Sequence, residues 1–265
     1  MVFTLFKRNI LSCMKVFIIL FAVICLYTTV IIYMYNPEIS DMLSGYQEVL
    51  PEMMSMVGMT GMASNILEWI QIYLYGFIML LFPMIFAVIL INKLVMNYID
   101  RGSMASLLSA PHSRVRIILT QAMSAILMMV LMMAAVTAVG IISCETLFPG
   151  ELAIARYIQL NASTTLLCLI VLGIAFAAAC FSSESKHYFT FGAGIPVLFF
   201  LFTMLSNMGG KMENLKYCTI YTLLPAEKIV QGESGSAIYN IVMAAASAIL
   251  FGGSIWWFKR RDLSL

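Results

Sequence analysis

Long apolar runs alternate with short polar segments along the whole chain. Six of these runs contain no Lys, Arg, Asp or Glu, and they cover residues 16–35, 69–91, 117–142, 161–181, 189–207 and 237–258. A helix of about 20 residues crosses a hydrocarbon core of about 30 Å, and only a helix satisfies its own backbone there. The pattern therefore predicts an all-α integral membrane protein with six transmembrane helices in a single domain, residues 1–265.

The amino-terminal 15 residues have a different pattern, because apolar and basic positions fall on opposite sides of a helix. Phe3, Phe6 and Ile10 recur at steps of three and four, while Lys7 and Arg8 occupy the other side. Such a basic amphipathic helix suits the headgroup surface of a membrane. We predict an interfacial helix over residues 1–15; the alternative is that these residues extend the first transmembrane helix.

Composition and charge fit this topology. The chain is 62% hydrophobic and 11% charged, with a mean hydropathy of +0.96, whereas soluble domains contain about 25% charged residues. If both termini are cytoplasmic, eleven of the 15 Lys and Arg residues and only three of the 13 acidic residues lie inside. This bias follows the positive-inside rule and predicts cytoplasmic termini. The net charge of +2 gives no reason to expect a nucleic-acid partner.

The last predicted outer segment, about 208–236, is too apolar for a solvated linker. Leu223, Leu224, Ile229 and Val230 need burial. We expect short re-entrant helices that dip into the membrane before the sixth helix, since non-helical backbone is tolerated at that depth only inside protein.

Two outer features leave alternatives open. The methionine-rich segment 53–62 offers soft thioether ligands for copper, but no His or Cys accompanies it and flexible packing is the other interpretation. Cys144 and Cys218 both fall on the predicted outer side. The sequence leaves open whether they form a disulfide, because it does not show their separation.

Several function classes are disfavoured by what the chain lacks. The six spans carry no ionisable group of the kind that couples proton- or ion-driven carriers. The two histidines, His112 and His187, lie in predicted cytoplasmic segments, so no intramembrane protease site is formed. No phosphate-binding loop is present, because Gly210-Lys211 lacks the upstream glycine and the following hydroxyl. We expect no catalytic residue, no metal and no cofactor in this chain, and any uphill transport must take its energy from a partner.

A short polar and basic segment, YIDRGSMASLLSAPHSRVRIILTQ at 98–121, separates the second and third spans. Gly102 and Pro111 bracket a stretch with helix-forming residues, and Asp100 or Ser103 is suited to cap it. Leu107 and Leu108 supply apolar side chains to this stretch. From the residues alone, the segment is either a docking helix parallel to the membrane or an ordinary positive-inside loop.

This segment resembles the signature region of ABC-2 type permeases, the membrane subunits of one class of ATP-binding-cassette exporters. The matching positions are Asp100, Gly102, Ser103, Leu107, Leu108, Pro111, Ser113, Arg114 and Ile117. The tail WWFKRRDLSL also resembles the end of these permeases. The chain departs from the pattern at Asp100, where the family more often has glutamate, and near Gln121, where a lysine is common.

The resemblance implies the role of the segment and the partners of the chain. Residues 103–110 would be a coupling helix that docks into a cytoplasmic ATPase subunit, which binds ATP and Mg²⁺. A second permease subunit, identical or different, would complete the transporter in membrane lipid. The expected location is the bacterial cytoplasmic membrane, and the expected cargo is hydrophobic or amphipathic, such as a peptide, antibiotic or lipid. The alternatives are a channel-like or structural membrane protein without an ATPase, or a secondary carrier.

Overall fold

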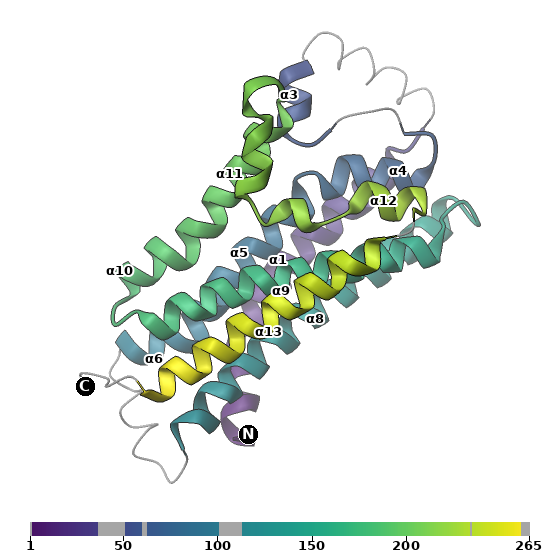
Figure 1. Ribbon diagram of the computed structural model, residues 1–265. Helices are drawn as coiled ribbons and strands as arrows, with labels where there is room; N and C mark the ends of the chain where they lie inside the picture. The colour runs from purple at the N-terminus through teal and green to yellow at the C-terminus, as the bar shows by residue number, and fades with distance from the viewer. Residues whose placement is uncertain (1, 37–50, 60–62, 101–112, 234, 261–265) are drawn as a thin grey trace.

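The computed structural model describes residues 2–36, 51–59, 63–100, 113–233 and 235–260, and every regular element among them is helical. Six helical units are long and apolar enough to cross a membrane, which confirms the predicted number and the all-α class (Figure 1). Four of these units are continuous helices: α1 (Phe3–Tyr33), α8 (Arg114–Leu147), α9 (Ile154–Phe181) and α13 (Ser236–Arg260).

The second unit is interrupted. It is built from α4 (Ile66–Ile70), the π-helix η1 (Gln71–Tyr75), α5 (Ile78–Ile91), the π-helix η2 (Asn92–Met96) and α6 (Asn97–Asp100). The break falls at Gly76 and Phe77, where Phe77 leaves helical geometry with a φ of −135°. A capping pair starts the unit: the Asn65 side chain accepts from the backbone N–H of Glu68, and Glu68 accepts from that of Ser64.

The fifth unit is interrupted as well, and it comprises α10 (Ser185–Tyr188), the π-helix η3 (Phe189–Ala193) and α11 (Gly194–Asn207). Like the second unit, it carries a proline shortly after a π-helix, Pro196 here and Pro83 in α5. π-Helical turns are rare and are found mostly at functional sites. The two irregular units are therefore the first place to look for moving parts.

Short helices cover the end of the bundle opposite to the two termini (Figure 1). They are α3 (Pro51–Met56), the 3₁₀ helices η4 (Gly210–Cys218) and η5 (Tyr221–Leu223), and α12 (Ala226–Gln231). The segment 208–236 thus forms short helices, as predicted, and Tyr221, Ile229 and Val230 are buried in it. How deeply these helices enter a membrane stays a prediction.

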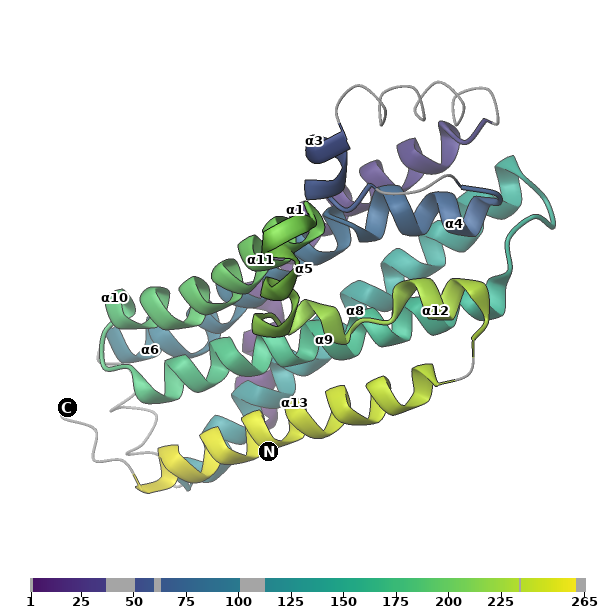
Figure 2. The ribbon, with the colours of Figure 1, turned by 45° about the horizontal axis from the view of Figure 1, so that its top comes forward.

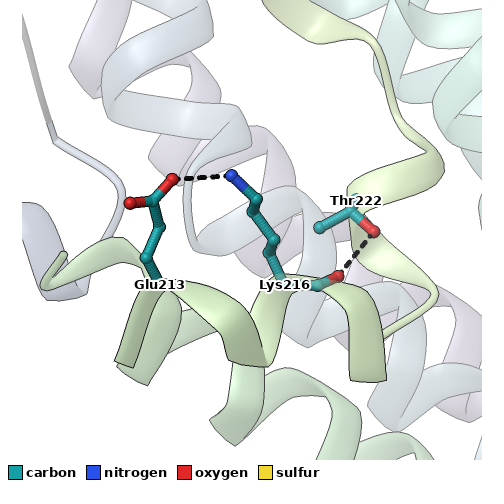
Figure 3. Close-up of polar contacts among 3 residues, drawn as sticks. All are labelled: Glu213, Lys216 and Thr222. Atoms are coloured by element: carbon teal, nitrogen blue, oxygen red, sulfur yellow. Dashed lines mark hydrogen bonds and ion pairs between the residues drawn. The ribbon is translucent and has the colours of Figure 1, made fainter. Parts of the chain in front are cut away.

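Polar contacts fasten η4 to η5 (Figure 3). Lys216 Nζ lies 2.6 Å from Glu213 Oε1, and the hydroxyl of Thr222 donates to the carbonyl of Lys216 at 3.0 Å. The hydrogen bond from Lys216 lowers the pKa of Glu213, and Glu213 raises the pKa of Lys216. Both side chains are exposed, so this pair orders a surface turn and adds little to stability.

The interior of the bundle lies around α5, α8 and α9. α13 lies alongside α9, and α1 alongside α8 (Figures 1 and 2). Phe86 and Phe176 are fully buried between these helices. At Gly140 of α8 the hydroxyl of Tyr157 lies only 2.1 Å from the position that a Cβ would occupy. Only glycine leaves room there for Tyr157, so this residue pair fixes how closely α8 and α9 approach.

The predicted boundary between an interfacial helix and the first span is absent, because residues 3–33 form the single helix α1. The segment contains no glycine or proline that would break it. Buried Asn9 also holds the amino-terminal part against α8. Within α1, Phe3, Lys7 and Arg8 are exposed, while Phe6 and Ile10 are half-buried.

The disulfide that the sequence left open is not formed. Cys144 and Cys218 are both free, with Cys144 buried in α8 and Cys218 exposed at the end of η4.

Candidate coupling and translocation site

The segment that resembles a coupling helix is described only at its two ends. Gly102, Ser103, Leu107, Leu108 and Pro111 lie outside the described residues. Asp100 ends α6 on the entering side, and Ser113 and Arg114 begin α8 on the leaving side. The structure therefore shows what each end of the predicted docking segment is attached to.

The entering end is bound to the fifth unit. The Asp100 carboxylate accepts a hydrogen bond from the backbone N–H of Ser185 at 3.2 Å and a second from the Ser185 hydroxyl. Ser185 is the first residue of α10. Asp100, which the sequence offered as a cap for its own segment, thus joins the end of the second unit to the start of the fifth.

A further hydrogen bond joins the same two units, one turn further along the fifth unit. The Tyr188 hydroxyl, fully buried, donates to the backbone carbonyl of Val88 in α5 at 2.6 Å. Gly192 makes this possible, because a Cβ there would lie 2.7 Å from the Tyr188 ring. Sequence reasoning missed this contact, although a tyrosine at the start of an apolar run is a signal that its hydroxyl needs a partner.

The leaving end is bound to the first unit. Ser113 caps α8, since its hydroxyl oxygen accepts from the backbone N–H of Arg116 at 3.4 Å. Two turns into α8, the Asn9 amide donates to Gln121 Oε1 at 2.6 Å and to Ser124 Oγ at 3.1 Å. Asn9 is buried within α1. The amide residues Asn9 and Gln121 within two long apolar helices were the signal for this contact.

The two ends of the candidate docking segment are therefore attached to different parts of the bundle. One end leads through Asp100 and Tyr188 to the interrupted second and fifth units. The other leads through Ser113 and Asn9 to the continuous helices α8 and α1.

The interrupted units separate again at the opposite end of the bundle, around a cavity of about 340 Å³. Its walls come from η1 and α5 on one side, α11 on another, and η5 and α12 across the end. Much of the lining is polar, including Gln71, Thr203, Asn207, Glu227 and Lys228. Beside this cavity the Phe77 and Phe200 rings are in contact, with centroids 5.4 Å apart. The two units thus meet near the termini and again at these rings, and the cavity lies between them at the far end.

Backbone contact between two glycines forms one wall of this cavity. A Cβ at Gly58 would lie 2.8 Å from the Cα of Gly76, and Gly58 has a φ of 76° that favours glycine. Gly76 is the residue at which the second unit breaks. The turn after α3 therefore rests directly on the break, and both glycines line the cavity.

The described residues contain no group of three or more His, Cys, Asp or Glu side chains that could hold a metal ion. Copper binding by the methionines of 53–62 is a separate matter, which stays an untested alternative.

The arrangement of the second and fifth units is suited to motion, with linked helices at one end and a polar cavity at the other.

A comparison with protein families gives one match that spans most of the chain. The model of the family described as "ABC-2 family transporter protein" matches residues 6–263. A search of curated proteins gives no match.

Proposed function

The chain belongs to the ABC-2 family of transporter proteins. It is a multi-pass membrane subunit of an ABC transporter. From this premise we propose that it is the permease of an exporter. In this proposal a separate cytoplasmic ATPase supplies the energy, and both termini of the chain face the cytoplasm. The cargo is hydrophobic or amphipathic, such as a peptide, antibiotic or lipid.

One observation carries the proposal: the second and fifth units are linked beside the candidate docking segment and diverge around a cavity at the far end. The links are the bonds of Asp100 to Ser185 and of Tyr188 to Val88. ATP-driven movement of the ATPase would reach these units through residues 103–110. Because the units are interrupted by π-helices, and α5 and α11 each carry a proline, they are the elements best able to bend.

The far cavity fits an exit for amphipathic cargo. Gln71, Thr203 and Asn207 offer hydrogen bonds, while Leu80 and Leu224 offer apolar surface. The proposed orientation places this cavity on the outer side. The polar cavity also favours transport over a purely structural role, which was one of the alternatives.

A second permease subunit is the remaining part of the proposal. The fifth unit exposes apolar side chains along α11, among them Val197, Leu198 and Leu201. Such a face is covered either by lipid or by another subunit. We propose that a partner subunit packs on this face of the fifth unit.

Variants of the docking segment test the proposal. Truncating Leu107 and Leu108 to alanine removes apolar contact that stabilises by about 1.5–3 kcal/mol for each buried leucine. We expect the Leu107→Ala, Leu108→Ala protein to insert normally and to bind its ATPase at least about a hundredfold more weakly. Co-purification of the ATPase with the tagged chain from its native host is the measurement.

The matched control is Ile241→Ala with Ile249→Ala, two exposed apolar side chains of α13, which should keep the ATPase. Full association of the leucine variant would show that residues 103–110 are only a loop. If no ATPase with a phosphate-binding loop accompanies the wild-type chain, the channel or carrier alternative gains support instead.

A further inference from the structure

A second hollow of the molecule lies outside the proposed transport path. It is a groove of about 670 Å³ between α9, the α10–η3–α11 unit and α13. Its volume is within the range of about 300–1,000 Å³ that is typical of small-ligand sites. The groove and the polar cavity share no lining residue.

Polar and apolar groups are segregated along the groove. The floor and sides are apolar, with Ala177 and Ala178 of α9 forming the floor and Ile195 of α11 and Leu250 of α13 the sides. Ser182, Ser183 and His187 line one end only, where α9 turns into α10. This is the end of the bundle that holds both termini (Figure 2), where the proposed orientation places the inner membrane surface.

Aromatic and basic side chains surround the polar end. The ring of Phe181, which lines the groove, contacts that of Trp257 in α13 with centroids 5.0 Å apart. One turn on, the Arg260 guanidinium lies over the Trp256 ring at 4.1 Å. Tryptophan and arginine in this arrangement are typical of the membrane–water boundary.

The charge at this end is mainly positive. Lys186 and His187 are exposed at the start of α10, and Lys259 and Arg260 are exposed at the end of α13. Of the described carboxylates near this end, Asp100 is bound to Ser185, which leaves Glu184 as the acidic neighbour. An anionic headgroup is therefore the favoured occupant of the polar end, because basic clusters at the inner surface attract anionic lipids.

We infer that this groove binds one anionic phospholipid of the inner leaflet. An acyl chain would lie along Ala177, Ala178 and Leu250, and the phosphate would lie near Lys186 and Arg260. A second copy of the chain fits less well, because it would bury these cations with few acidic partners. The inference rests on the chain lying in a membrane and does not require the ATPase.

The test uses the tryptophans beside the groove. The purified intact chain in detergent is titrated with phospholipids whose acyl chains carry bromine, which quenches tryptophan fluorescence on contact. Trp257 contacts Phe181 of the groove and Trp256 is its neighbour in α13, whereas Trp69 is buried at the other end. We expect saturable quenching that needs several-fold less phosphatidylglycerol than phosphatidylcholine.

Two variants separate the acyl-chain site from the headgroup site. Ala177→Phe fills the groove and should abolish the saturable quenching, while Ala245→Phe, on an exposed face of α13, should leave it unchanged. Lys186→Gln with Arg260→Gln leaves the groove open and should remove the several-fold preference for the anionic lipid.

Equal quenching by both lipids, unaffected by Ala177→Phe, would overturn the inference, because it would indicate only the unspecific lipid shell. Seating of a second copy in the groove, detected by crosslinking between Phe191→Cys and a partner chain with no lipid retained, would overturn it as well. Either result would leave the ATPase proposal untouched, whereas loss of the ATPase in the leucine test would leave this one untouched.

Discussion

Four of the six membrane units are continuous helices and two are not, and this difference separates a scaffold from the parts suited to move. α1, α8, α9 and α13 run for 31, 34, 28 and 25 residues without a break. The second and fifth units are assembled from short α-helices joined by π-helical turns. Both interrupted units line the polar cavity, and both are linked beside the candidate docking segment.

The two interrupted units also differ from each other. In their most apolar stretches, 67% of the second unit is buried but only 22% of the fifth. The second unit is therefore held inside the scaffold, while the fifth lies against it from outside. Motion that changes the cavity is expected mainly in the fifth unit, since fewer contacts must be broken to displace it.

The largest effect is expected within the scaffold. Gly140→Ala places a Cβ 2.1 Å from the Tyr157 hydroxyl and should destabilise the protein by about 1–3 kcal/mol through overpacking. Thermal unfolding of the purified chain is the measurement. Gly252→Ala in α13, where nothing lies within 4 Å of the new Cβ, should leave stability unchanged or raise it.

A double variant tests the cause of this loss. Adding Tyr157→Phe to Gly140→Ala removes the closest atom and should restore part of the stability. If Gly140→Ala behaves like Gly252→Ala, then α8 and α9 are not fixed by close contact and the scaffold is softer than the structure indicates.

The next effect concerns the wall of the cavity. Gly58→Ala combines an unfavourable positive φ, costing about 1–2 kcal/mol, with a clash against Gly76. The turn after α3 should lift away and expose the cavity. A cysteine at Asn207, in a cysteine-free background, should then react faster with a membrane-impermeant thiol reagent.

Gly150→Ala is the matched control, because Gly150 has a φ of 80° but no neighbour within 4 Å. Gly150→Ala shares with Gly58→Ala the energetic cost of an alanine at positive φ, but it lacks the clash with a neighbouring residue. Equal labelling rates in the two variants would mean that the contact with the break in the second unit does not close the cavity.

A smaller change in stability is expected at the buried link between the interrupted units. Tyr188→Phe removes the hydrogen bond to the Val88 carbonyl, and such bonds in membrane proteins contribute about 0.6–1.7 kcal/mol. We expect slightly lower stability together with reduced ATP-driven transport in reconstituted vesicles. Tyr33→Phe, at an exposed position, should change neither; transport at the wild-type level in Tyr188→Phe would remove this bond from the coupling path.

The smallest change in stability is expected at the exposed link. Asp100→Asn or Ser185→Ala weakens a surface bond worth about 0.5–1.5 kcal/mol. The ATPase should remain bound, while its hydrolysis becomes less coupled to transport. The double variant should be no worse than either single one, and Glu184→Gln should be silent; additive losses would show that the two residues act separately.

Much of the fold was predictable because a bilayer imposes simple rules. A run of about 20 apolar residues has to form a helix there, so the six units and their order follow from the apolar pattern. Helix breaks were not predictable in this way. The interruption at Gly76 and Phe77 lies inside a run of apolar residues, and the π-helical turns leave no mark in composition.

The site was predictable only in part. The motif at 98–114 predicts a docking segment for an ATPase, which stays a prediction, and the partners of its ends were not deducible. Asp100 looked like a local cap, and its partner Ser185 lies 85 positions away. Asn9 lies in the amphipathic amino-terminal segment, and only the structure shows that it is buried against Gln121 and Ser124. Contacts of this kind depend on which helices are neighbours.

The sequence by itself determined that this protein lies in a membrane, its helical class, the number of spans and the distribution of charge, because each follows from local composition and spacing. Only the tertiary structure decided that α1 is one helix and that the second and fifth units meet through Asp100 and Tyr188. It also decided that a polar cavity and an apolar groove with separate linings lie beside the fifth unit. These features arise where side chains that are distant in the sequence come into contact. The hydropathy of a helix does not indicate which other helix packs against it.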